Sequence, residues 1–209
     1  MGRRIRGLDA DQRRAERREQ LLDAALDLFA KQGYLATSIE QICSTAYVGT
    51  KSFYEIFDSR EACYLGLLQR VSERLEARMV ELATQATGSE RQVAPELLAA
   101  FVHALLDDPR VVKVTFGQAS GISQVIERQR RTNRRWTATF LESLWDRFDE
   151  TTDDPARRAV AIGLVGGLFD LVADWLLDAD LGDAGQVENL IDDLTSFYIT
   201  VRRGLVTKS

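Results

Sequence analysis

The 209-residue sequence contains few of the residues on which most enzymes and metalloproteins depend. It has a single histidine, and its two cysteines, Cys43 and Cys63, lie at no spacing that is typical of metal ligands. We find no glycine-rich phosphate loop and no nucleophile motif. These absences argue against an enzyme and predict neither a cofactor nor a metal site. These absences do not exclude an enzyme that uses a pair of catalytic carboxylates, although nothing in the sequence points to such a pair.

Long apolar runs are also missing from the chain. The longest strongly apolar stretch, residues 159–169, has 11 residues and is bracketed by charged side chains, which is too short to cross a bilayer. No apolar run follows the arginines near the N-terminus, so we expect no secretory signal. With so few cysteines, the chain is predicted to reside in a reducing cytoplasm and to have no membrane partner.

Strand patterns are absent as well, whereas helical periodicity runs through most of the chain. We therefore predict an all-α fold with about nine helices. Gly33 is placed to end the first helix, and the second is predicted to open with a capping box of Thr37 and Glu40. The expected helices cover about residues 11–32, 37–46, 49–57, 59–82, 95–106, 109–119, 123–148, 155–177, and a last helix after residue 185.

Charge is unevenly distributed along the chain, whose formal net charge is −5. Residues 1–18 contain seven arginines and three acidic residues, whereas acidic residues outnumber basic ones over residues 61–209. This contrast predicts an anionic partner for the N-terminal end. An N-terminal arm with Arg3, Arg4 and Arg6 fits a DNA minor groove, but it fits a disordered solubilising tail equally well.

Residues 37–60, TSIEQICSTAYVGTKSFYEIFDSR, have the pattern of two short helices joined by a tight turn. Small polar residues, Gly49, Thr50, Lys51 and Ser52, begin the second helix, and Phe53 and Phe57 can anchor its far side. That division is what a helix needs to approach base edges in the DNA major groove. Tyr54 lies beside this face, where a phenol can bond a phosphate. The alternative is an ordinary three-helix packing unit that does not contact DNA.

At these residues the chain resembles the DNA-binding domain of the TetR family of bacterial transcriptional regulators, over about residues 15–65. The resemblance rests on an ordered set of positions: Gly33-Tyr34, Thr37-Ser38-Ile39, Ile42, Ala46, Val48, Phe53-Tyr54, Phe57 and Arg60-Glu61-Ala62. It implies phosphate contacts from Thr37, Tyr54 and Arg60. It also implies base or backbone contacts from Thr50, Lys51, Ser52 and Glu55.

Two positions depart from the family pattern. Tyr47 occupies the position of the usual turn glycine, so we expect the turn to be shifted or slightly strained. Glu55 occupies a position where the family often has histidine, and a carboxylate near phosphates is repelled unless it accepts from a cytosine amino group. The operator sequence therefore cannot be inferred from relatives.

The resemblance also implies an N-terminal helix-turn-helix domain, residues 1–60, and a helical effector-binding and dimerisation domain, residues 61–209. Glycines four residues apart on one face of the helix over residues 155–177 suggest close approach by another helix. With the last helix, this predicts a homodimer interface that includes Gly163, Gly166, Gly167, Leu190, Leu194 and Phe197. Packing within one chain is the alternative.

Candidates for an effector pocket are apolar and aromatic residues with a few polar neighbours: Phe101, His103, Phe116, Gln118, Trp136, Phe140 and Trp175. Each of them is also compatible with a plain core position. The arginine run from Arg128 to Arg135 can face DNA, an anionic effector or solvent. Cys43 and Cys63 can either sense oxidation or pack as small apolar residues.

These features predict a cytoplasmic bacterial regulator that binds a pseudo-palindromic operator in double-stranded DNA as a homodimer. A partly apolar small-molecule effector is expected to release it, and repression follows only from the family's common mode. The competing hypotheses are an enzyme and a DNA-binding protein without an effector.

Overall fold

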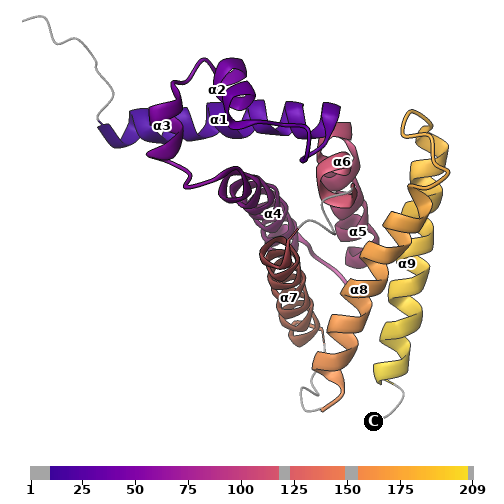
Figure 1. The fold of residues 1–209 in the computed structure, drawn as a ribbon. Coiled ribbons are helices and arrows are strands. Elements are labelled where there is room, and N and C mark those ends of the chain that lie inside the picture. The colour runs from indigo at the N-terminus through magenta and orange to yellow at the C-terminus, as the bar shows by residue number, and fades with distance from the viewer. Residues whose placement is uncertain (1–9, 118–122, 149–154, 207–209) are drawn as a thin grey trace, which may run out of the picture.

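The structure is a computed structural model that describes residues 10–117, 123–148 and 155–206. Arg3, Arg4, Arg6 and Gln118 lie outside these ranges. Within them the fold is all-α, as the sequence predicts, and contains nine helices (Figure 1). Their bounds are α1 Ala10–Gln32, α2 Ile39–Ala46, α3 Thr50–Tyr54, α4 Arg60–Gln85, α5 Glu90–Leu106, α6 Pro109–Phe116, α7 Gln124–Asp146, α8 Arg157–Trp175 and α9 Ala184–Val206.

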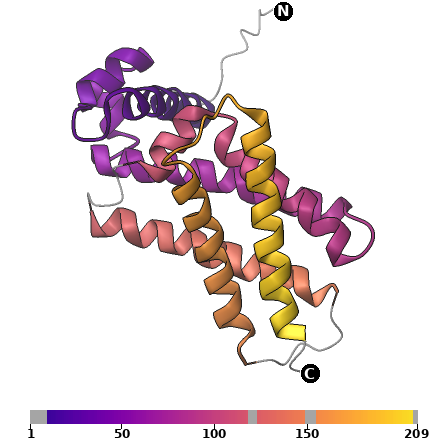
Figure 2. The same ribbon diagram turned by 90° about the vertical axis from the view of Figure 1, so that its right-hand side faces the viewer.

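The first three helices lie together across one end of the molecule, and α4 runs from them into a body formed by α5 to α9 (Figure 1). In the body, α8 and α9 lie side by side along one face (Figure 2). None of the helices within the described ranges has the length and apolar character needed to traverse a bilayer.

Two large apolar cores and a smaller third one hold the molecule together, and α4 contributes to all three. Its first turns place Cys63, Tyr64 and Leu67 in the core of the N-terminal unit, beside the helices α1 to α3. Further along, Leu75 and Met79 pack against the core of the body. The predicted boundary after residue 60 therefore coincides with the start of a helix that both units share.

The start of α2 differs from the prediction. Ser38, not Thr37, is the N-cap: its side chain accepts from the backbone N–H of Gln41 (3.2 Å), and the Gln41 side chain accepts from the N–H of Ser38 (2.8 Å). Thr37 is completely buried, and its hydroxyl donates to the Gly33 carbonyl (2.8 Å). The capping box is thus one residue later than Thr37 and Glu40, because Thr37 is used to close the preceding loop.

Two other helix limits also differ. Helix α3 ends at Tyr54 rather than Phe57, although the N–H of Phe57 still bonds the Phe53 carbonyl (2.8 Å). Helix α5 begins at Glu90, so Pro95 lies inside it rather than at its start. The Gln92 side chain accepts from the Ser89 N–H (3.0 Å), which stabilises the earlier start, and Pro95 removes only one backbone bond near the helix end.

The N-terminal unit is tied to the body by polar contacts as well as by α4. The Tyr64 hydroxyl donates to the Val114 carbonyl of α6 (2.7 Å), and burial raises the pKa of Tyr64 to about 12. On the surface, Arg110 of α6 bridges Asp27 of α1 (2.6 Å) and Asp108 (2.7 Å). These contacts link α1, α4 and α6, so a displacement of α4 or α6 is transmitted to α1.

The buried Tyr64 bond gives a first prediction. The substitution Tyr64→Phe removes the donor and leaves the Val114 carbonyl without it, so the free energy of unfolding should fall by about 1–2 kcal/mol. Urea denaturation measures the change. Tyr54→Phe removes a hydroxyl from an exposed ring and should leave the midpoint unchanged. Equal midpoints for Tyr64→Phe and the wild type would contradict this role of the bond.

Candidate nucleic-acid interface and ligand cavity

Helix α3 separates a docked apolar side from an exposed polar side. Phe53 is fully buried, and Phe57 just beyond the helix is also buried in the N-terminal core. Gly49, Thr50 and Lys51 at the helix start are exposed. Ser52 is half-buried, and the side chains of Tyr54 and Glu55 are exposed. The polar turn is therefore presented to the outside by a helix that its aromatic residues hold in place.

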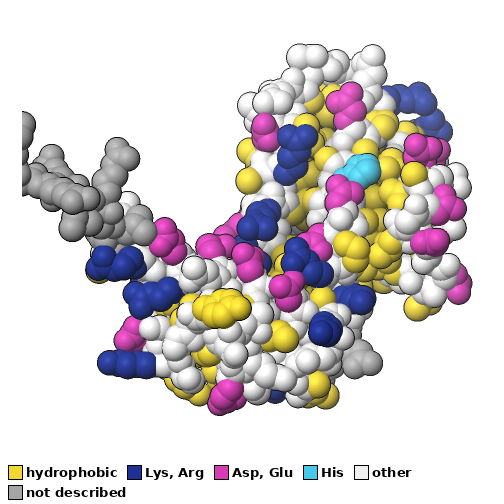
Figure 3. Space-filling view, turned by 90° about the horizontal axis from the view of Figure 1, so that it is seen from above, with side chains coloured by type: hydrophobic (Ala, Val, Ile, Leu, Met, Phe, Trp, Pro, Cys, Tyr) yellow, Lys and Arg dark blue, Asp and Glu magenta, His cyan; other side chains and the backbone are white. Residues whose placement is uncertain are grey.

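Arginines of α1, in the same N-terminal unit, contact α3 and the residue that follows it. Arg17 donates to the Ser52 hydroxyl (3.2 Å), and Arg14 donates to the backbone carbonyl of Glu55 (3.1 Å). Lys and Arg side chains gather at the end of the molecule where the described chain begins (Figure 3). The sequence predicts a basic N-terminal end, and the structure places these arginines beside α3. Their spacing, which puts Arg13, Arg14, Arg17 and Arg18 on one helical face, is the signal that was missed.

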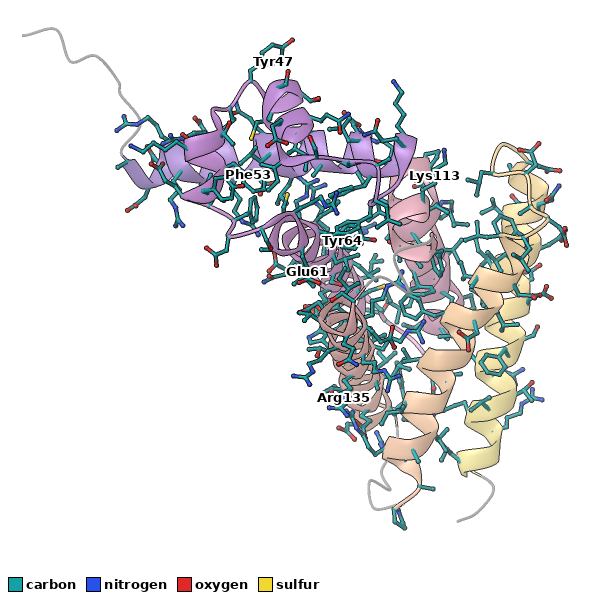
Figure 4. The ribbon with its side chains drawn as sticks, viewed as in Figure 1. Tyr47, Phe53, Glu61, Tyr64, Lys113 and Arg135 are labelled. Atoms are coloured by element: carbon teal, nitrogen blue, oxygen red, sulfur yellow. The ribbon has the colours of Figure 1, made fainter. Side chains whose placement is uncertain are left out.

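The turn between α2 and α3 is not shifted by its tyrosine. Tyr47 itself adopts the left-handed conformation, with φ 55° and ψ 35°, and its side chain is 98% exposed. The ring projects away from the helices at the tip of the N-terminal unit (Figure 4). The expected strain is therefore located in the backbone of Tyr47. The bond from the N–H of Val48 to the Cys43 carbonyl (3.0 Å) helps to hold the turn in this conformation.

Two residues implied as phosphate contacts have other roles in this structure. Thr37 is buried and its hydroxyl bonds the Gly33 carbonyl, so it is not accessible to a phosphate. The predicted phosphate contact from Thr37 is therefore wrong. Arg60 lies over the Tyr34 ring at 4.3 Å and donates to the Thr37 carbonyl (2.5 Å). Its guanidinium thus ties the start of α4 to the loop before α2.

An apolar cavity lies in the body between α4, α5, α7, α8 and α9. Of the predicted ligand residues, Phe101, Trp136 and Phe140 line it. Its volume is about 40 Å³. The sequence pattern did not predict the other lining residues, because apolar positions at helical spacing look the same in a core and in a pocket. These residues are Leu75, Met79, Ala94, Leu97, Leu98, Thr137, Leu141, Val165, Leu168, Phe169 and Tyr198.

The remaining predicted ligand residues lie elsewhere. His103 is on the surface, where its Nδ1 is 2.9 Å from the Asp107 carboxylate, so its assignment to the pocket is wrong (Figure 3). Phe116 packs against Phe169, with ring centroids 6.2 Å apart. Trp175 is a partly buried member of the body core. The side chain of His103 points outward because its helix buries Phe101, Val102 and Leu105 instead.

The predicted dimer residues fall into two groups. Leu190 and Leu194 are buried within the chain, and Gly167 lies so close to Phe197 that a Cβ there would be 2.7 Å from the ring. Leu190 and Leu194 are therefore core residues rather than an interface, since α9 packs its apolar stripe against α5 and α8. Gly163 and Gly166 have open space where a side chain would be.

Most of the arginine run is exposed, but Arg130 is half-buried, its Nη2 has no hydrogen-bond partner among the described residues, and burial lowers its pKa. Arg128, Arg131, Arg134 and Arg135 are exposed, and Arg135 points away from the body (Figure 4). Both cysteines are free and buried, and burial raises the pKa of the Cys63 thiol to about 12. A thiol that stays protonated reacts slowly with oxidants, which favours a packing role. The described part of the chain contains no cluster of potential metal ligands.

Comparison with known proteins places this arrangement among bacterial regulators. Residues 21–67 match the family model described as bacterial regulatory proteins of the tetR family. The chain is 28% identical over 182 residues to the HTH-type transcriptional activator FasR of Mycolicibacterium smegmatis. That match covers 84% of this chain and 81% of FasR.

Solved structures resemble the chain over most of its length. A TetR-like transcriptional regulator from Rhodococcus sp. RHA1 is 25% identical, with a TM-score of 0.63, and the match covers 91% of this chain and 96% of that one. FadR from Bacillus subtilis, solved in complex with stearoyl-CoA, is 17% identical with a TM-score of 0.68. That match covers 86% of this chain and 98% of FadR, and shows a shared fold.

The conformation of Tyr47 gives a second prediction. Glycine adopts positive φ without the steric cost that a side chain incurs, so Tyr47→Gly should raise the free energy of unfolding by about 1 kcal/mol. Tyr47→Ala is the matched control, because it removes the same exposed ring but keeps the Cβ. Urea denaturation that shows no difference between the glycine and alanine variants would contradict a strained turn.

Proposed function

The chain belongs to the TetR family of bacterial regulatory proteins, and on this premise we propose that it regulates transcription by binding an operator under the control of a small molecule. The observation that carries the proposal is the exposed polar turn of α3, residues 49–52, on a helix anchored by buried Phe53. Members of the family are regulators rather than enzymes, so the proposed activity is binding and not catalysis. The proposed site of action is the bacterial cytoplasm.

The proposed DNA contacts divide between bases and phosphates. Thr50 and Lys51 are exposed at the start of α3 and are proposed to approach base edges in the major groove. Tyr54 and Arg14 lie beside them and are proposed to contact phosphates, which position the helix but do not select a sequence. Ser52 keeps its bond to Arg17, so this arginine orients the reading helix, and Arg14 adds positive charge next to Glu55.

A binding experiment tests this assignment. Fluorescence anisotropy with DNA from upstream of the protein's own gene, across a salt series, should show tight and sequence-selective binding. Tyr54→Ala should weaken it, and Arg14→Ala should reduce the salt slope by about one, because one phosphate contact is lost. Asp192→Asn changes an exposed charge on α9 and serves as the control. Weak binding that is equal on random DNA would contradict selective reading by α3.

A homodimer is proposed because two half-sites of an operator require two reading helices about 34–36 Å apart. The exposed face of α8 supports it: Ile162 is 47% exposed and Leu171 is 39% exposed at the two margins of this face, and Gly163 and Gly166 lie between them with open space above. Apolar side chains and glycines on an exposed helix face are what close helix pairing between two copies needs.

Light scattering tests the dimer. The wild type should have the mass of a dimer at micromolar concentration, and Ile162→Asp should shift it toward the monomer, because the interface would bury a charge. Val125→Asp places the same charge at a 52% exposed position on α7 and should leave the mass unchanged. A monomeric wild type would contradict the interface.

The effector is proposed to be an apolar chain that binds in the cavity of the body. The lining is almost entirely apolar, and the fold neighbour FadR from Bacillus subtilis was solved with stearoyl-CoA. Leu75 and Met79 belong to α4, so a ligand that enlarges the cavity displaces the helix that also carries Tyr64 in the N-terminal core. By linkage, such a ligand lowers DNA affinity if it favours another spacing of the two reading helices.

We propose repression that the ligand relieves. The relative FasR is named an activator, and the direction of control depends on where the operator lies relative to the promoter. A regulator without any effector is the competing proposal, and the absence of any binding by apolar-chain ligands would favour it.

A further inference from the structure

Two side chains of α7 line two different hollows. Trp136 and Phe140 form part of the wall of the internal apolar cavity, and they also form part of the wall of a surface groove between α4 and α7. The groove has a volume of about 360 Å³ and is further lined by Val80, Thr84 and Arg147, among others. The two aromatic side chains therefore lie between the cavity and the groove.

The pair is arranged as a stacked unit. Trp136 and Phe140 lie one helical turn apart, and their rings are nearly parallel, with centroids 5.5 Å apart and an angle of 13°. Both residues are half-buried, so neither is locked on all sides by the core. A rotation of the two side chains would join the groove to the cavity without moving a helix.

The two hollows differ in chemistry. Within the cavity, Tyr198 has a hydroxyl that is already used: it donates to Glu90 (2.5 Å) and accepts from the Trp145 indole (2.9 Å). An ionised group would be desolvated there without a partner, at a prohibitive cost. The groove, in contrast, is open to solvent and has the guanidinium of Arg147 on its wall, although the hydroxyls of Thr139 and Ser143 already donate to backbone carbonyls of α7. An amphiphile would therefore place its tail inside and its head outside.

The size of the cavity requires that something moves. Its volume of about 40 Å³ is close to the share of one water molecule in the liquid, roughly 30 Å³. An extended hydrocarbon chain does not fit this space unless lining side chains turn away. Trp136 and Phe140 are the lining side chains that the cavity shares with the groove, so their rotation adds the required length in the direction of solvent.

We propose that Trp136 and Phe140 form an aromatic gate. The apolar tail of a single-chain amphiphile with an anionic head group passes this gate into the cavity, and the head group stays in the groove beside Arg147. The inference rests on the proposed function for the existence of an effector, and adds its route, its orientation and the polar group that it meets.

Arg147 connects the groove to the end of α4. Its guanidinium donates to the backbone carbonyls of Ala83 and Ala86, at the C-terminus of that helix. A head group that attracts Arg147 competes with these carbonyls, so binding in the groove alters the hold on α4 at the same time as the tail presses on Leu75 and Met79. Both ends of the ligand thus act on the helix that reaches the N-terminal core.

Stopped-flow tryptophan fluorescence with stearoyl-CoA tests the gate on the full-length protein. Phe140→Ala opens the gate and should raise the association rate by roughly tenfold, whereas Ser143→Phe obstructs the groove and should lower it by a similar factor. Thr132→Phe adds the same ring at an exposed position of α7 outside the groove and should bind at the wild-type rate. Coenzyme A alone should not bind, because it has no tail.

Further variants keep the outcome interpretable. Phe140→Leu preserves apolar volume and removes the stacking, so it should also accelerate association if Phe140→Ala fails to fold. Leu168→Phe fills the cavity and should weaken stearoyl-CoA more than a shorter acyl-CoA. Unchanged association rates in the Phe140 and Ser143 variants, with stearoyl-CoA bound by the wild type, would overturn the gate and leave the proposed effector response intact.

The remaining outcomes separate the two proposals. If neither stearoyl-CoA nor stearate binds the wild type, the gate and the effector response are both overturned, while selective DNA binding by the same preparation would retain the regulator without an effector. If stearoyl-CoA binds through the gate and DNA affinity does not change, the gate stands and the proposed control of DNA binding fails.

Discussion

Helix α4 packs against the core of the N-terminal unit with its first turns and against the core of the body further along. This packing in two cores constrains the rest of the structure. Cys63, Tyr64 and Leu67 belong to the core of the N-terminal unit, whereas Leu75 and Met79 border the cavity in the body. Because closely packed interiors resist deformation, a helix held in two cores cannot move in one without disturbing the other. The Tyr64 bond to α6 and the Arg110 bridge to α1 add polar contacts to the same connection.

The reading helix depends on this framework because it is too short to be stable alone. Helix α3 has only five residues, and isolated helices of that length do not persist in water. Phe53 and Phe57 hold it from below, and Arg14 and Arg17 of α1 bond to it from the side. Tyr47, just before it, has a left-handed backbone conformation. Strain of this kind is retained where the contacts of the surrounding structure fix the backbone. The result is a rigid presentation of Thr50 and Lys51.

The body combines an apolar cavity with polar attachments at its margin. Trp145, Tyr198, Glu90 and Arg202 form a buried network that joins α5, α7 and α9 below the cavity, so that part of the wall is held firmly. Another part of the wall is the stacked pair of Trp136 and Phe140 next to a surface groove. A cavity with a hydrogen-bonded network on one side and a stacked aromatic pair next to the groove suits the proposed ligand, which enters from the groove and displaces α4.

Local elements followed from the sequence, because helical periodicity, the glycine after α1 and the polar start of α3 are encoded in neighbouring residues. The pattern did not distinguish Thr37 from Ser38 as the N-cap, since both are good capping residues and only the buried loop selects between them. It also did not distinguish core from interface at Leu194, or core from pocket at Leu168, because an apolar stripe has the same appearance whichever surface covers it. Contacts between helices far apart in the chain determine which surface covers each apolar stripe. Only the tertiary structure therefore shows where the cavity lies, that His103 is on the surface, and that arginines of α1 contact α3.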